Sequence, residues 1–342
     1  MRVGVLVSGG DCPGLNAAVR GAVLRGVDVY GYEYIGYRDG WRGVRDNEFM
    51  PLNRAAVRGI APLGGTILGS SRVSPLGDGA IGVSGLKQHM RDNAIDGFIT
   101  IGGNGTQTVA NMLFQEGIPV LGLPKTIDND LVGTDYSFGF DTAVHIATEA
   151  IDRLRTTGQS HRRCMVLEVM GRDAGWIALH AGVAAGAQVI LVAEHSESAE
   201  QIAEWVTKVD QRGRSALVVV AEGFIPLGYD TEITREGSDG FGRKRLGGVA
   251  EILAAEIEKI SGIETRATVL GHVQRGGVPT AFDRVLATRA GIRVADAAAD
   301  GEWGKMVAAR GERMELVPLA EVGGKTKHVP KERYLEVRRL FG

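Results

Sequence analysis

Short apolar runs that end at glycines recur along the chain. Val3–Val7 leads to the pair Gly9-Gly10 and then to a helical pattern near Leu15–Arg25. Strands that are apolar throughout and alternate with helices are typical of a parallel sheet buried on both faces. Ligands of such open sheets bind beyond the carboxyl ends of the strands. The pattern therefore predicts an α/β protein whose binding sites lie where the glycines cluster.

The same order of apolar run, turn and helix is repeated further along. The additional predicted strands are Gly97–Ile101, Ile118–Leu123, Met165–Val169, Val189–Ala193, Ala216–Ala221 and Thr268–Leu270. Helices are predicted at Thr106–Glu116 and Val249–Ile260. A chain of 342 residues exceeds the size at which one hydrophobic core keeps growing, so we expect two domains.

Charge and composition exclude several classes of function. The net charge of -2 provides no basic surface field for nucleic acid or anionic lipid, and we predict neither partner. No apolar run approaches the ~18 residues typical of a membrane span. The N-terminus starts directly with a strand and has no signal-peptide pattern. Cys12 and Cys164 form no paired motif, so we predict a reducing, cytoplasmic location.

Two glycine turns separate a predicted strand from a predicted helix. Ser8–Asn16 reads SGGDCPGLN, and Ile101–Thr106 reads IGGNGT. Exposed backbone N–H groups at a helix N-terminus bind anions, so both turns can cradle phosphate, although a tight turn without a ligand would look the same. Phosphoryl transfer normally uses a metal ion across the phosphates, and the side chain available in the second turn is Asn104.

The segment Pro124–Asp130 carries the highest density of chemistry in the chain. It reads PKTIDND and follows a buried strand with two carboxylates, an amide, a hydroxyl and an ammonium. One aspartate could accept the proton of an attacking sugar hydroxyl, and the other could support a metal ion. The alternative is an Asx-turn loop whose aspartates only cap backbone groups.

Two later clusters combine arginine or histidine with glycine. Met170–Arg172 follows one strand, and Gly271–Gly277 follows another, with Arg266 just upstream. Arginine binds phosphate in a bidentate manner, which suits a phosphorylated substrate, although an inter-subunit salt-bridge cluster would look similar. A Walker A loop is excluded because Leu319 replaces its leading glycine, so Gly323–Lys325 is interpreted as a plain surface turn.

Together these motifs resemble the 6-phosphofructokinases. The segments SGGDCPGLNAAVR, GGTILGSSR, IGGNGT, PKTIDND, EAIDRLR, SHRR, EVMGR, AEG and TRATVLGHVQRGG occur in that family's order and spacing, from residue 1 to about residue 330. The resemblance implies two Rossmann-like three-layer domains with mostly parallel sheets. It places a large phosphoryl-donor domain at 1–138 plus about 275–322, and a small sugar-phosphate domain at 139–274 plus about 323–342.

The resemblance also implies the chemistry. The family phosphorylates the 1-hydroxyl of fructose 6-phosphate with MgATP or, in some branches, pyrophosphate. Asp128 matches the general base, Thr126 lines the same pocket, and Asp130 lies near the Mg²⁺. Arg72 and Arg172 would stabilise charge on the transferring phosphoryl group.

Further residues carry over as binding positions. Those matching the donor (ATP) site are Gly10, Arg72, Val73, Gly103, Asn104, Gly105 and Thr106. Those matching the sugar-phosphate site are Thr126, Ile127, Asp128, Met170, Gly171, Arg172, Glu222, His272, Val273, Gln274 and Arg275. Arg163 and Arg266 correspond to residues that reach the 6-phosphate from a neighbouring subunit, so a homotetramer with shared active sites is expected.

Three residues bear on the phosphoryl donor. In this family, glycine at position 105 leaves room for a nucleotide, which favours ATP. Lys125 is typical of pyrophosphate users and their ATP-using relatives. Asn104 replaces an acidic metal residue and can coordinate only weakly, through its carbonyl oxygen. We therefore expect an ATP-dependent 6-phosphofructokinase, with a pyrophosphate-dependent enzyme and a catalytically weakened sugar-phosphate sensor as alternatives.

The residues matching the family's effector site are altered. Arg20 is present, but Leu24 occupies the position of its partner arginine. Arg54 and Arg155 remain, while the stretch Gly186–Gln188 has no acidic side chain. The resemblance therefore implies no activation by ADP of the usual kind.

Overall fold

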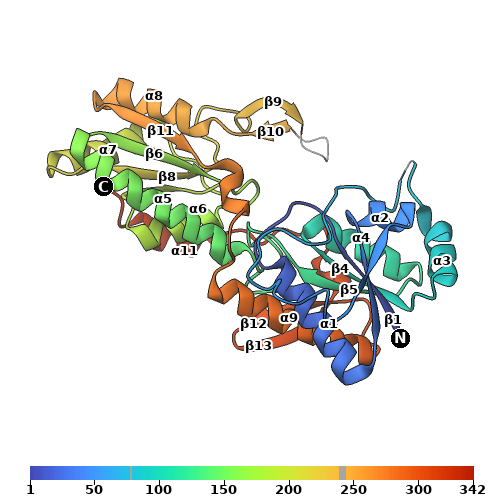
Figure 1. Ribbon diagram of the computed structural model, residues 1–342. Helices are drawn as coiled ribbons and strands as arrows, with labels where there is room; N and C mark the ends of the chain where they lie inside the picture. The colour runs from blue at the N-terminus through green and yellow to red at the C-terminus, as the bar shows by residue number, and fades with distance from the viewer. Residues whose placement is uncertain (78, 239–243) are drawn as a thin grey trace. The chain divides into compact units, whose positions relative to one another are not determined.

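The structure is a computed structural model that describes residues 1–77, 79–238 and 244–342. It divides into two compact units (Figure 1). The first comprises Met1–Thr142 and Arg275–Thr326, and the second comprises Ala143–Gln274 and Lys327–Gly342. Both units are thus assembled from two stretches of chain.

A seven-stranded sheet forms the centre of the first unit, as far as the described residues go. Its order is β13-β12-β5-β4-β1-β2-β3. The strands are β1 (Arg2–Val7), β2 (Glu33–Tyr37), β3 (Phe49–Leu52), β4 (Gly97–Gly102), β5 (Val120–Pro124), β12 (Lys305–Arg310) and β13 (Arg313–Pro318). The five inner strands run parallel, whereas β3 and β13 pair antiparallel at the two edges. The carboxyl ends of β1, β4 and β5 therefore lie side by side.

Helices cover both faces of this sheet. Alternate residues of a strand point to opposite faces, so Leu6, Phe98 and Met306 belong to one core cluster together with residues of the helices on that side. That face is covered by α2 (Trp41–Asp46), α3 (Gly82–Asp92), α4 (Asn104–Gln115) and α10 (Leu319–Val322). The other face carries α1 (Leu15–Tyr30) and α9 (Ala281–Ala299), which pack against each other.

The second unit contains a four-stranded parallel sheet of order β11-β6-β8-β7 in its described part. The strands are β6 (Cys164–Val169), β7 (Val189–Leu191), β8 (Leu217–Ala221) and β11 (Thr265–Val269). A two-stranded antiparallel ribbon, β9 (Thr234–Ser238) and β10 (Lys244–Leu246), belongs to the same unit.

Helices again sandwich this sheet. Helices α7 (Ala199–Gln211) and α8 (Val249–Ser261) share a core cluster with one face. Helix α6 (Trp176–Ala185) packs on the opposite face, where a Cβ on Gly182 would lie 2.7 Å from Ile190. The remaining helices are α5 (Phe140–His161), which begins in the first unit, the short 3₁₀ helix η1 (Gly271–Arg275) and α11 (Lys331–Arg338).

The predicted fold class is confirmed: both main sheets are mostly parallel and are layered with helices. Several details differ from the sequence analysis. Strand β11 begins at Thr265, three residues before the predicted start, and β2, β9 and β10 were not predicted. Helix α4 begins at Asn104, two residues before the predicted start, so Asn104 and Gly105 are its first residues. The antiparallel edge strands of the first unit were not predicted. Among the described residues, no helix combines the length and the hydropathy that crossing a membrane requires.

Glycines allow α1 and α9 to approach closely. A Cβ on Gly291 of α9 would overlap the carbonyl oxygen of Ala18 and lie 2.8 Å from the backbone nitrogen of Ala22. A Cβ on Gly21 of α1 would overlap the carbonyl of Thr288 in the same way. Both clashes involve backbone atoms, so they can be relieved only if the helices separate.

We therefore expect Gly291→Ala to lower the free energy of unfolding of the first unit by about 1–3 kcal/mol, the usual cost of overfilling a packed interface. Urea unfolding followed by circular dichroism measures this change. The matched control is Gly105→Ala, in a helix where a Cβ meets nothing within 4 Å. An equal loss in both variants would contradict the packing argument.

Candidate active site

The carbonyl oxygen of Ser8 joins the two glycine turns of the first unit. It accepts a hydrogen bond from the Thr106 hydroxyl at 3.4 Å, while Ser8 N donates to Ile101 O at 3.0 Å. It also accepts a bond from the Lys125 ammonium at 3.0 Å. The structure thus brings together the ends of β1, β4 and β5, whose turns the sequence analysis assigned to the phosphoryl donor and the base.

Lys125 is buried beneath the first glycine turn. Its ammonium donates to the carbonyls of Ser8 and Gly10, and its side chain is 3% exposed. Burial lowers the pKa of Lys125 to about 8. Burial also raises the pKa of the neighbouring Cys12 thiol to about 12, so this thiol stays neutral at physiological pH. Lys125 therefore supports the backbone of the turn from below.

The loop after β5 is rigidly held. The Thr126 hydroxyl accepts a bond from Asp128 N at 3.1 Å, and Ser137 Oγ donates to Thr126 O at 2.7 Å. Asn129 adopts a left-handed conformation (φ 51°), and its buried side chain contacts Ser137 N and Asp135 O. The carboxylates of Asp128 and Asp130 therefore project from a backbone that is fixed on both sides.

The second glycine turn leads directly into α4. Gly103 is its N-cap, Asn104 and Gly105 open the helix, and its first turn contains no acidic residue. Gly105 faces open space, because an added Cβ would meet nothing within 4 Å. An anion at this position would benefit from the positive end of the helix dipole.

Asn104 has a use that the sequence did not indicate. Its Oδ1 accepts a bond from Gly324 N at 2.8 Å, and its Nδ2 donates to Lys325 O at 2.9 Å. The segment Gly323–Lys325, interpreted from the sequence as a plain surface turn, is thus tied to the start of α4. The role of Asn104 as a weak metal ligand stays a prediction.

Arg72, Val73 and Arg275 lie beside the first glycine turn. Ser71 forms a bridge with Ser8, which places the next two residues, Arg72 and Val73, at that turn. Arg275 Nη1 donates to Asp11 O at 3.3 Å and would lie 3.0 Å from a Cβ on Gly10. The turn is therefore flanked by cationic groups.

The first unit can supply oxygen ligands for a metal ion only sparsely. The described residues contain no cluster of three or more His, Cys, Asp or Glu side chains suited to a metal. Asp130 is the carboxylate predicted to lie near the ion, and Asp128, the predicted base, is two residues before it in the loop after β5. Mg²⁺ is commonly held by one or two carboxylates together with substrate phosphates and water, and this donor set fits that pattern.

In the second unit, predicted sugar-phosphate residues gather where β6, β8 and β11 end. Gly223 N donates to Gly171 O at 3.1 Å, and a Cβ on Gly223 would overlap the carbonyl oxygen of Arg172. The Gln274 side chain is fully buried and accepts a bond from Met170 N at 3.3 Å. Arg172 forms an ion pair with Glu232 at 3.8 Å. Met170–Arg172, Glu222 and η1, which carries His272, Val273 and Gln274, thus occupy one end of the sheet.

Arg163 and Arg266 occupy the opposite end of the same strands. Arg163 directly precedes β6, and Arg266 is the second residue of β11. Because β6 has six residues, it separates Arg163 from Met170 by roughly 20 Å. One chain therefore cannot bring these arginines and its own Met170–Arg172 to the same small ligand.

Parts of the predicted effector site also come together. Arg155 Nη2 donates to the carbonyls of Ala185 and Gly186, and Gln188 Nε2 donates to Gly186 O at 3.0 Å. In the first unit, Arg54 forms an ion pair with Asp28. The absence of activation by ADP stays a prediction.

Comparisons with known proteins show the family of the chain. The family model described as "Phosphofructokinase" matches residues 2–298. The chain belongs to the phosphofructokinase family. It is 55% identical to the pyrophosphate–fructose 6-phosphate 1-phosphotransferase of Amycolatopsis methanolica, with complete coverage of both chains. It is 49% identical to the ATP-dependent 6-phosphofructokinase 3 of Streptomyces coelicolor, over 98% of each chain.

A solved phosphofructokinase has the same fold. The crystal structure of the pyrophosphate-dependent enzyme from Marinobacter aquaeolei superimposes with a TM-score of 0.81 at 26% identity, covering 97% of this chain and 86% of that one. The family resemblance inferred from the motifs is therefore confirmed.

Two supporting residues were missed by the sequence analysis. Asn129 was noted only as an amide, although its left-handed backbone shapes the Pro124–Asp130 loop. Asp283 accepts bonds from Gly139 N at 2.9 Å and Thr142 N at 2.8 Å, and burial raises its pKa to about 6. A residue 141 positions away along the chain therefore anchors the end of the segment that follows the loop.

The depressed pKa of Lys125 predicts a pH dependence of stability. Its folded pKa, about 8, lies below the reference value of 10.5, so the unfolded chain binds more protons between these values. The free energy of unfolding should therefore gain from this group as pH rises from 8 to 10, by up to about 3 kcal/mol at 1.36 kcal/mol per pKa unit.

Lys125→Met removes this contribution, so the difference in unfolding free energy between wild type and variant should grow over that pH range. Urea titrations at pH 7, 8, 9 and 10 measure it. Lys208→Met, at an exposed position of α7, is the matched control for removing a lysine that is not buried. Parallel curves for wild type and Lys125→Met would show that burial does not depress the pKa.

Proposed function

We propose that this chain transfers a phosphoryl group to the 1-hydroxyl of fructose 6-phosphate. The observation that carries the proposal is the convergence of Ser8–Asn16, Ile101–Thr106 and Pro124–Asp130 at one sheet edge, through the Ser8 carbonyl and Lys125. Two glycine turns for phosphate and a rigid loop with two carboxylates are the parts that such a transfer needs. The names of the relatives at 55% and 49% identity support the same acceptor.

In the proposed mechanism, Asp128 accepts the proton of the 1-hydroxyl as that oxygen attacks the phosphoryl group. Thr126 and Ser137 fix the loop, so the carboxylate needs little rearrangement before reaction. Arg72 and Arg172 provide positive charge for the transferring group, where charge spreads over its oxygens. The amino end of α4 and the first glycine turn hold the donor phosphates.

Mg²⁺ is part of the proposal. Asp130, with Asp128 nearby, would hold it together with the donor phosphates, and the ion would neutralise charge on those phosphates. The amide of Asn104 is already bonded to Gly324 and Lys325, so it contributes most directly by fixing the start of α4.

The comparisons favour pyrophosphate as the donor, against the expectation of ATP. The relative at 55% identity is named for pyrophosphate, and the ATP-dependent one follows at 49%. Lys125 is typical of the branch that contains the pyrophosphate users and their ATP-using relatives. ATP is kept as a second candidate because of Gly105, where an added Cβ would meet nothing within 4 Å and the residue itself has no side chain to exclude a nucleotide.

A coupled assay with saturating fructose 6-phosphate decides between the donors. We expect kcat/KM for pyrophosphate to exceed that for ATP by at least about tenfold, or 1.4 kcal/mol. A higher value for ATP would establish the second candidate. Turnover near background with both donors would support the weakened sensor.

The variant Gly105→Asp tests how position 105 contributes. Its carboxylate would repel a third phosphate at the start of α4, so any ATP activity should fall about 100-fold while pyrophosphate activity changes little. Gly105→Ala is the uncharged control, and both activities should survive in it.

The role of Asp128 is tested with Asp128→Ser. Loss of a general base typically lowers rates 10²–10⁴-fold, so kcat should fall by about that range while KM for fructose 6-phosphate stays within a few-fold. Asp92→Ser, at an exposed position of α3, is the control. An unchanged kcat would reject Asp128 as the base.

The same variant tests the proposed sharing of sites between subunits of a homotetramer. Co-expression of Asp128→Ser with Arg163→Ala/Arg266→Ala should form assemblies in which some sites combine intact Asp128 with intact arginines from the neighbour. Activity should then exceed the sum of the two variants alone. Activity equal to that sum would show that each chain builds its site alone.

A further inference from the structure

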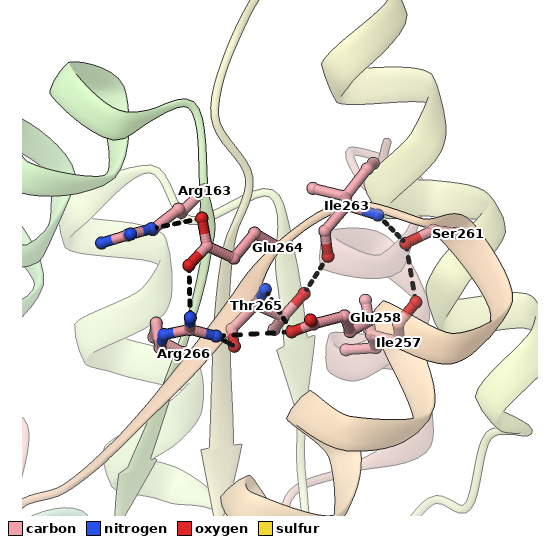
Figure 2. Close-up of polar contacts among 8 residues, drawn as sticks. All are labelled: Arg163, Ile257, Glu258, Ser261, Ile263, Glu264, Thr265 and Arg266. Carbon is pink, nitrogen blue, oxygen red and sulfur yellow. Dashed lines mark hydrogen bonds and ion pairs between the residues drawn. The ribbon is translucent and has the colours of Figure 1, made fainter.

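One carboxylate joins the two arginines that the proposed function assigns to the 6-phosphate (Figure 2). Glu264 Oε2 lies 2.7 Å from Arg163 Nε, and its Oε1 pairs with Arg266 Nη2. The guanidinium groups hold the pKa of Glu264 below its usual range, with Arg163 as the main cause. The carboxylate is therefore ionised at neutral pH and bridges the two cations.

Strand pairing fixes the positions of all three residues. Cys164 N donates to Glu264 O at 2.9 Å, and the parallel register pairs Thr265 with Cys164 and Arg266 with Met165. Arg163 and Glu264 thus immediately precede neighbouring strands. Each is adjacent to the first residue of a paired strand, and the bond from Cys164 N to Glu264 O holds one of them to the neighbouring strand, so the side chains start from well-defined points.

Glu258 of α8 supports Arg266 from another side. Its Oε2 accepts a bond from Thr265 N at 3.0 Å and from Arg266 Nη1 at 3.4 Å, and Arg266 Nη1 also donates to Thr265 O at 2.9 Å. Two arginines and two glutamates balance in charge, which offsets the repulsion between the guanidinium groups. The arginines can therefore stay close together without a bound ligand.

The contacts leave phosphate-binding capacity on Arg163. Glu264 contacts its Nε, and among the eight residues of Figure 2 no interaction reaches its Nη atoms. A guanidinium has five N–H donors and binds phosphate through pairs of them. The side chains of Arg163 and Arg266 are 33% and 51% exposed, so a ligand outside the sheet end can reach both.

We propose that Glu264 is a positioning residue that holds Arg163 and Arg266 as a preformed clamp for the 6-phosphate of fructose 6-phosphate bound to a second copy of the chain. This inference rests on the proposed function. Glu264 touches the arginines and not the reacting atoms. Its effect should therefore appear in the affinity for the sugar phosphate, while the chemical step and the donor site remain unaffected.

The test uses the full-length protein carrying Glu264→Gln, which keeps the shape and removes the charge. KM for fructose 6-phosphate should rise about tenfold, the size of a lost charge-assisted hydrogen bond, with kcat and the KM of the donor within twofold of wild type. Glu264→Asp should restore part of the affinity. Glu204→Gln is the matched control, because Glu204 pairs with Lys208 at 2.7 Å on the exposed face of α7.

A double-mutant cycle separates positioning from general stabilisation. If Glu264 acts through the arginines, Glu264→Gln should change KM less than twofold in an Arg163→Ala/Arg266→Ala background. An equal tenfold effect there would overturn the inference. A KM that is unchanged or lowered in Glu264→Gln would also overturn it, a lowered value meaning that Glu264 competes with phosphate.

Failure of the clamp proposal can be distinguished from failure of the proposed function. A wild type that neither binds fructose 6-phosphate in calorimetry nor turns it over contradicts the proposed function itself. An active wild type whose Glu264→Gln variant behaves like Glu204→Gln contradicts only the clamp. Sedimentation of each variant at assay concentration shows whether assembly is preserved. If it is not, the double-mutant cycle shows whether Glu264 acts through the two arginines.

Discussion

A buried ammonium holds the donor half of the site together. Lys125 extends from the end of β5 to the carbonyls of Ser8 and Gly10, which follow β1, while Thr106 of α4 reaches Ser8 as well. Burying a lysine is costly unless its donors are bonded, and here backbone carbonyls of a turn accept them. Those carbonyls lie beyond the last residue of β1. The ammonium therefore supplies hydrogen-bond donors to them at the edge where the ligand is proposed to bind.

This arrangement also connects structure with ligand binding. An anion placed above the first glycine turn would favour the charged form of Lys125, in the direction opposite to burial. Arg275 and Arg72 beside the same turn lower the pKa of Lys125, as burial does, because like charges repel. The positive charges of this cluster repel one another, and a bound phosphate would offset that repulsion. Pre-arranged charge of this kind needs little reorganisation at the moment of transfer.

The sequence was sufficient for the features that depend on local pattern. Apolar runs such as Val3–Val7 predict inner strands because both faces of those strands are buried, and glycines mark their ends. It was not sufficient where distant segments meet. The edge strands β3 and β13 have weaker patterns, and the bond between Asn104 and Gly324 spans 220 residues. The bridge of Arg163 and Arg266 through Glu264 depends on strand register, which periodicity does not specify.

Overall similarity to this chain differs little between relatives named for the two donors. Relatives named for pyrophosphate and for ATP are 55% and 49% identical to this chain over nearly its whole length. A fold that differs so little cannot be rebuilt for each donor. Position 105 offers a physical route, since an added side chain there meets open space and would disturb no packing. A single carboxylate at the start of α4 could then exclude a third phosphate while the base, the sugar site and the sheet stay unchanged. Identity over the whole chain favours pyrophosphate, and the charge at the amino end of this one helix is the feature by which variants of this chain can test that donor.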